Sequence, residues 1–164
     1  MAKLTMEFIG FSDLEGRLTV GGGIPTLSRT KQNTYLCTVE STEKSLEVVI
    51  HKSHRYTGRL WFFWNLLFFF ISILGIFDVR PNKKFPVLDG RLRIPLEEDT
   101  SLLIRRLDFA DGAPLFAVEN GEAEVLFNLQ YYDKEARRRH KIFSRFKLIA
   151  TVLLVLLLII ILAL

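Results

Sequence analysis

The sequence predicts a membrane protein whose soluble part is mainly β, with short antiparallel strands in a sandwich-like arrangement, and which carries two hydrophobic membrane helices. Two long runs without a charged residue, 60–77 and 148–164, predict the helices. Elsewhere apolar and polar residues alternate with a period of two, the pattern of half-buried strands. Turn dipeptides such as Asp111-Gly112 and Asn120-Gly121 separate the strand segments.

Residues 148–164 form an apolar run that is expected to anchor the chain as a tail. As a helix, this run would measure about 25 Å, close to the ~30 Å hydrocarbon core of a bilayer. Residues 134–147 precede it and are rich in Lys and Arg, so they predict a basic juxtamembrane helix. Asp133 is placed to cap the start of this helix.

The first apolar run, residues 60–77, contains only Asn65 and Ser72 as polar residues. It lacks the polar face of a helix that lies on a membrane surface, so a complete crossing is favoured. Trp61 and Trp64 lie near its start, where indole rings suit the headgroup level as interface anchors. A buried core helix and a re-entrant element with both ends on one side remain alternatives.

The first β-rich half spans residues 1–59. Four strands are expected, within residues 4–8, 18–20, 35–39 and 46–50, with a turn at Glu15-Gly16 before the second. Residues 21–25 carry three consecutive glycines and predict a loop, and no Gly-Lys-Ser/Thr follows to suggest phosphate binding. The polar residues 26–33 are expected to form an exposed connection.

The second β-rich half spans residues 78–133. A turn at Asp89-Gly90 followed by a strand is expected in residues 88–94, and a further strand in residues 102–109. The last strand, residues 124–131, would place four apolar side chains on one face: Val125, Phe127, Leu129 and Tyr131.

The two halves resemble each other, which suggests an internal duplication. Residues 14–20 and 88–94 share the pattern Leu, acid, Gly, Arg, Leu, any residue, β-branched aliphatic, and residues 46–50 resemble residues 123–127. Common turn chemistry reused by chance is the alternative. If residues 60–77 cross the bilayer, the halves lie on opposite sides; if the run is re-entrant, they can share one core.

Charge around the apolar runs bears on topology. Basic residues precede the second run and none follows it, so residues 78–147 are predicted to be cytoplasmic in a protein of the cell membrane. Both flanks of the first run are basic, which leaves the side of residues 1–59 open. Six basic residues are predicted to contact anionic headgroups or to fix topology: Arg137, Arg138, Arg139, Lys141, Arg145 and Lys147.

No catalytic, cofactor-binding or metal-binding motif is recognisable, so we expect neither an enzyme nor a cofactor. Cys37 is the single cysteine, which excludes an internal disulfide. Glu97-Glu98-Asp99 is interpreted as a solvated turn, with a divalent cation or a basic partner as the alternative. The basic residues lie beside the apolar runs, which does not favour nucleic-acid binding.

These features favour a non-enzymatic accessory or scaffolding subunit of a membrane assembly. Its β module would offer strand edges to partners, and its helices would pack against integral membrane partners or further copies of the chain. Asn65 and Ser72 are the candidates for helix–helix contact, because polar side chains can hydrogen-bond between membrane helices. The alternative is a membrane-anchored sensor or carrier that binds a small molecule or lipid between its sheets.

Overall fold

The computed structural model of the chain describes residues 1–12, 14–53, 56–71 and 85–163. They divide into two compact units. One comprises the described residues within 1–52 and 87–131, and the other comprises the described residues within 53–86 and 132–164.

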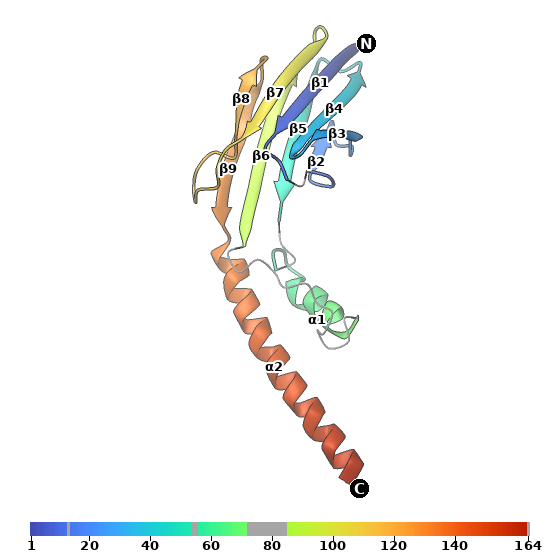
Figure 1. Cartoon of the computed structure of the whole chain (residues 1–164), viewed down its shortest axis with the longest axis vertical. Helices are drawn as coiled ribbons and strands as arrows, with labels where there is room; N and C mark the ends of the chain where they lie inside the picture. Colours follow the sequence, from blue (N-terminus) through green and yellow to red (C-terminus); the bar gives the residue numbers. More distant parts are fainter. Residues whose placement is uncertain (13, 54–55, 72–84, 164) are drawn as a thin grey trace. The chain divides into compact units, whose positions relative to one another are not determined.

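The first unit consists of two β-sheets (Figure 1). The five-stranded sheet has the order β3-β4-β1-β7-β8, and the four-stranded sheet has the order β2-β5-β6-β9. In the first sheet the strands are β1 (Ala2–Ile9), β3 (Leu27–Lys31), β4 (Thr34–Ser41), β7 (Thr100–Arg106) and β8 (Phe116–Asn120). In the second they are β2 (Leu18–Val20), β5 (Ser45–Lys52), β6 (Pro86–Pro95) and β9 (Glu124–Tyr132).

The core lies between these sheets, because alternate side chains of both point into one apolar cluster. Leu4, Met6 and Phe8 of β1 are fully buried, as the period-two pattern of this segment predicts. They share the cluster with residues of the other sheet, such as Val48 of β5 and Leu92 of β6. The prediction that the part outside the helices is mainly β and sandwich-like is therefore confirmed.

One strand pair differs from the antiparallel arrangement that the sequence predicts. β1 and β7 run parallel, with Leu4 opposite Thr100 and Ile9 opposite Arg105. Parallel neighbours need a long connection between them, and here β1 and β7 come from different halves of the sequence. The pair lies in the middle of its sheet and joins the two halves.

The pairing of β5 with β6 joins the halves in the second sheet and bears on residues 60–77. Ser45 lies opposite Pro95 and Lys52 opposite Leu88 in an antiparallel ladder. The chain that leaves at Lys52 therefore returns beside it. A single complete crossing would separate these ends by about 30 Å of hydrocarbon. The favoured complete crossing is therefore wrong, and both halves contribute to one core.

Two local predictions also need correction. Residues 26–33 contain strand β3, whose polar side chains suit its position at a sheet edge. The Asp89-Gly90 turn is absent, because both residues lie inside the continuous strand β6. A Cβ atom on Gly90 would lie 2.5 Å from Cε1 of Phe116, so this glycine permits close packing inside the sandwich.

The order of elements recurs along the chain. Strands β2 to β5 send two neighbouring strands, β3 and β4, into the first sheet and two, β2 and β5, into the second, and α1 follows. Strands β6 to β9 repeat this arrangement with β7 and β8 in the first sheet and β6 and β9 in the second, and α2 follows. Of the first pair of similar segments, residues 14–20 end in β2 and residues 88–94 lie inside β6. Of the second pair, residues 46–50 lie inside β5 and residues 123–127 begin one residue before β9. This recurrence agrees with a duplication, which stays a prediction.

The second unit contains the helices α1 (Trp61–Ile71) and α2 (Lys134–Ala163). The Asp133 carboxylate accepts a hydrogen bond of 2.8 Å from the backbone N–H of Ala136, so the predicted cap of α2 is present. Among the described residues α2 is the one helix long and apolar enough to cross a membrane. The prediction for Ser72 and the rest of the first apolar run, residues 72–77, falls outside the described residues.

Candidate membrane-binding unit

The apolar half of α2 is the largest exposed apolar surface in the described chain. Every side chain described from Leu148 to Ala163 is exposed except that of Ala150, which is half-buried. Leu154 is 36% exposed and Leu162 is 83% exposed. A soluble chain rarely leaves so large a contiguous apolar surface in water, and the length and composition of this helix suffice to cross a membrane.

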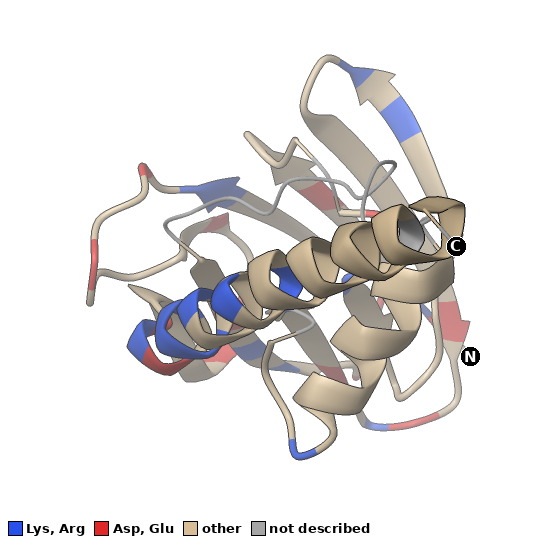
Figure 2. Ribbon diagram, turned by 90° about the horizontal axis from the view of Figure 1, so that it is seen from below, with Lys and Arg blue, Asp and Glu red and all other residues tan. Residues whose placement is uncertain are grey.

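The basic segment occupies the first half of α2, as Figure 2 shows by its blue turns. The side chains of Arg137, Arg138, Lys141 and Arg145 are exposed and can contact anionic groups. Arg139 and Lys147 differ from these four because they are half-buried. The predicted headgroup set thus divides into four exposed cations and two that contact other parts of the same unit.

Arg139 ties α2 to the chain that precedes α1. Its guanidinium donates hydrogen bonds of 3.0 Å to the carbonyl oxygens of both Tyr56 and Gly58. It also pairs with Glu135 one turn earlier and lies 5.7 Å from the centre of the Trp61 ring. A planar guanidinium suits this combination of carbonyl binding and aromatic stacking, so Arg139 stabilises this unit.

A cluster of aromatic rings fills the space beside Arg139. The Tyr56 ring lies 5.6 Å from Phe85 and 5.1 Å from His140, centre to centre, both in edge-to-face geometry. Phe143 and Phe69 complete the buried cluster with Ala136. Aromatic residues near the apolar runs were the one sequence signal for this cluster, because its members come from four separate segments.

The two faces of α1 have different surroundings. Asn65 and Phe69, one turn apart, are buried. The Asn65 side chain, predicted to make a helix–helix contact, donates a hydrogen bond of 2.7 Å to the carbonyl oxygen of Trp61 in its own helix. Trp61 is half-buried, whereas Trp64 is 48% exposed. Of the two predicted interface anchors, Trp64 is therefore the one whose ring is more available to contact groups outside this unit, such as lipids.

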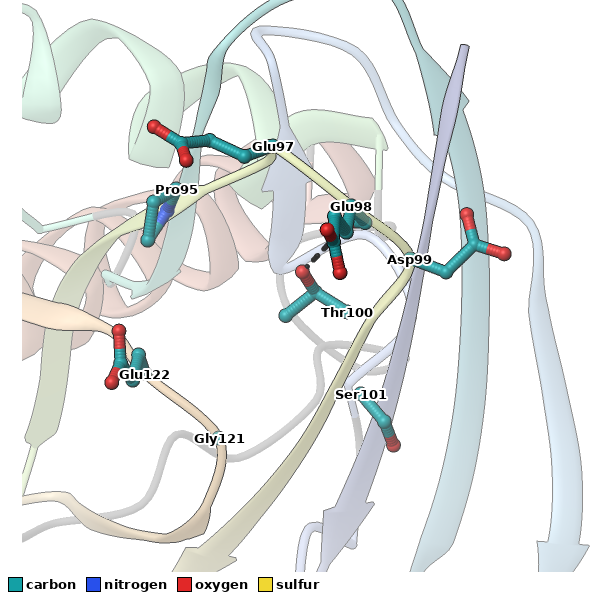
Figure 3. A pocket seen from close by; sticks show the side chains of 8 residues that line it. All are labelled: Pro95, Glu97, Glu98, Asp99, Thr100, Ser101, Gly121 and Glu122. Atoms are coloured by element: carbon teal, nitrogen blue, oxygen red, sulfur yellow. Dashed lines mark hydrogen bonds between the residues drawn. The ribbon is translucent and has the colours of Figure 1, made fainter.

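The acidic segment at residues 97–99 borders an open hollow of about 550 Å³ in the sandwich. The Glu97 and Asp99 carboxylates point in different directions (Figure 3), and Asp99 accepts a hydrogen bond of 2.8 Å from the backbone N–H of Lys3. Among the described residues, no group of three or more His, Cys, Asp or Glu side chains is arranged to hold a metal ion. The carboxylates do not converge on one point, and the interpretation as a solvated turn stands.

The space between the two sheets is where the alternative function, a sensor or carrier, would hold a small molecule or lipid. Buried side chains from both sheets occupy the space between them, including Phe8, Phe116 and Leu92. Cys37 is one of these core residues, and its burial raises the pKa of its thiol to about 11. A thiol that resists ionisation in this way is a poor nucleophile or metal ligand.

No protein-family model, curated protein or solved structure matches the chain.

Proposed function

We propose that this chain is a non-enzymatic accessory or scaffolding subunit of an integral membrane assembly, with both of its helices in the membrane. The observation that carries the proposal is the exposed apolar surface of α2, which directly follows a basic segment. This order of charge and hydrophobicity is the one expected of a membrane span with its basic flank on the cytoplasmic side.

The exposed cations support contact with anionic headgroups on that side. Arg137, Arg138, Lys141 and Arg145 each contribute about 1 kcal/mol of attraction when held near an anionic surface. Residues 78–147 are cytoplasmic in this proposal. Because the two halves share one core, residues 1–59 lie on the same side.

The edge strand β9 supports binding of a protein partner. Val125, Leu126 and Phe127 are consecutive and are 49%, 39% and 42% exposed. Charged side chains commonly protect a strand edge from pairing with another chain. Arg29 and Lys31 occupy edge strand β3 in this way. β9 contains Glu124 as its one charged residue and no proline. An extended segment of a partner membrane protein could add to this edge by β-strand addition.

Purification of the tagged full chain from membranes in a mild detergent tests this function. We expect a stoichiometric partner that is lost from Leu126→Lys, because a charge at the exposed centre of this apolar run opposes docking. Ser28→Lys on edge strand β3 is the matched control and should retain the partner. A chain that purifies alone, or a partner retained by Leu126→Lys, would contradict the proposal.

A further inference from the structure

The strand pairing on either side of α1 limits how the chain can enter a bilayer. The described residues of α1, Trp61–Ile71, extend about 16 Å. The chain leaves the sandwich at Lys52 and returns beside it, since Lys52 pairs with Leu88. Both ends of the excursion are therefore on one side of the membrane.

Contacts between α1 and α2 fix the depth of α1 relative to the basic segment. Near the start of α1, Trp61 lies against Arg139 and Phe62 lies 5.7 Å from Phe143. Toward its end, Phe69 lies 5.5 Å from the Lys147 ammonium group. Arg139 and Lys147 are charged, so their head groups belong at the level of the lipid headgroups. The long side chain of Lys147 allows its backbone to lie somewhat deeper than its ammonium group. The helix α1 thus lies beside the basic part of α2.

The face of α1 turned away from α2 is apolar along its whole length. Trp64, Leu67 and Ile71 follow the helical spacing i, i+3, i+7 and are all exposed. Phe63 and Phe70 beside them are 56% and 60% exposed, and α1 contains no charged residue. A helix of this composition has no side suited to water, whereas its large aromatic rings suit the upper acyl chains and the headgroup boundary.

We propose that α1 is a wedge that inserts shallowly into a single leaflet, the one that contacts the basic segment of α2, with its exposed aromatic face at the headgroup boundary and the upper acyl chains. This inference rests on the proposed function, because it takes α2 as the membrane span. Lipid is favoured over a partner helix as the occupant because the apolar face continues beside the level of the exposed cations, where headgroups and acyl chains meet.

The two tryptophans of the chain both lie in α1, so fluorescence reports its depth directly. The full chain with Trp61→Phe keeps Trp64 as its one fluorophore and is reconstituted into phosphatidylcholine/phosphatidylglycerol vesicles. The phosphatidylcholine is brominated either near the headgroup end or near the methyl end of its acyl chains. Bromines near the headgroup should quench Trp64 at least about twofold more than bromines near the methyl end, since an indole at the interface lies far from the bilayer centre.

A second variant separates this inference from the proposed function. Trp61→Phe/Trp64→Phe/Leu153→Trp carries its fluorophore in the apolar half of α2 and should be quenched more by the deep bromines. Deep quenching at position 153 with no quenching of Trp64, or with deeper quenching of Trp64, overturns the single-leaflet wedge and leaves the α2 anchor intact. Absence of quenching at both positions overturns the anchor as well.

Discussion

The guanidinium of Arg139 donates a hydrogen bond of 3.0 Å to the carbonyl oxygen of Tyr56, 83 positions away in the sequence. A second bond of the same length to Gly58 and the nearby Trp61 ring make Arg139 the polar link between the two helices of this unit. This link explains why the apolar helix α1 begins beside a charged segment. The carbonyl oxygens of Tyr56 and Gly58, which precede α1, accept their hydrogen bonds from Arg139.

Arg139→Gln should loosen the segment that contains Tyr56 and Trp61. Loss of the charged donor to two carbonyl groups costs about 1–2 kcal/mol for a half-buried site. The measurement is quenching of Trp61 fluorescence by acrylamide in the full chain with Trp64→Phe, held in detergent micelles. We expect the quenching constant to rise. Arg138→Gln, which removes an exposed cation of the same charge, is the control, and an equal rise in both variants would contradict the role given to Arg139.

Gly90→Ala should destabilise the sandwich. The added Cβ would lie 2.5 Å from Phe116 Cε1 and 3.3 Å from Leu115 Cδ2, so the core must shift at a cost of about 1–3 kcal/mol. Urea unfolding of the full chain in detergent, followed by the circular dichroism of the sheets, measures the change. Gly23→Ala should have a small effect, because its Cβ meets only the Val20 carbonyl oxygen, at an ordinary 3.7 Å. Equal midpoints for wild type and Gly90→Ala would show that Phe116 can move aside.

Gly90 also illustrates what the sequence could and could not predict. Asp111-Gly112 forms a turn with its glycine at positive φ, as predicted. Gly121 also has a positive φ, but Asn120 is the last residue of β8, and the chain passes there to the other sheet and forms no hairpin. The same chemistry at Asp89-Gly90 predicted a turn that is absent, because the need for space next to Phe116 depends on a residue far along the chain. Local patterns thus predicted most strands and turns, but they missed the strands β3 and β8 and the features set by distant contacts.

Strand β9 shows a second limit. Alternation predicts an apolar face of β9, but burial along the strand does not alternate, because Val125, Leu126 and Phe127 are all exposed. Val125 and Phe127 are exposed, whereas Gln130 is fully buried and donates hydrogen bonds to the carbonyl oxygens of Asp108 and Pro114. A polar residue can thus be the buried one when its amide satisfies loop backbone groups. Arg139 likewise donates to carbonyl oxygens of a distant segment, so the sequence pattern could not distinguish it from the exposed cations around it.

Cys37 should resist thiol reagents while the sandwich is folded. Burial raises the pKa of its thiol from 9.0 to about 11, and the fully buried sulfur is out of reach of a maleimide. We expect slow modification at neutral pH and rapid modification in denaturant. The sign of the shift gives a second expectation: the raised folded pKa stabilises the fold fully below pH 9, and this contribution declines as the pH rises from 9 toward 11. Cys37→Ala should show a shallower decline over that range, and rapid labelling of the native chain would contradict the burial.

The shared core predicts that positions 30 and 111 lie on the same side of the membrane. Both side chains are exposed, one in edge strand β3 and one in the turn after β7, so single cysteines at Thr30 and Asp111 can be labelled without unfolding. In a Cys37→Ala background, an impermeant maleimide should label neither position in intact cells and both positions in lysed cells, because the proposed function places the sandwich in the cytoplasm, on the side of the basic flank of α2. Labelling of both positions in intact cells would reverse the orientation but keep the single core. Labelling of only one would separate the halves across the bilayer, which the pairing of Lys52 with Leu88 does not allow.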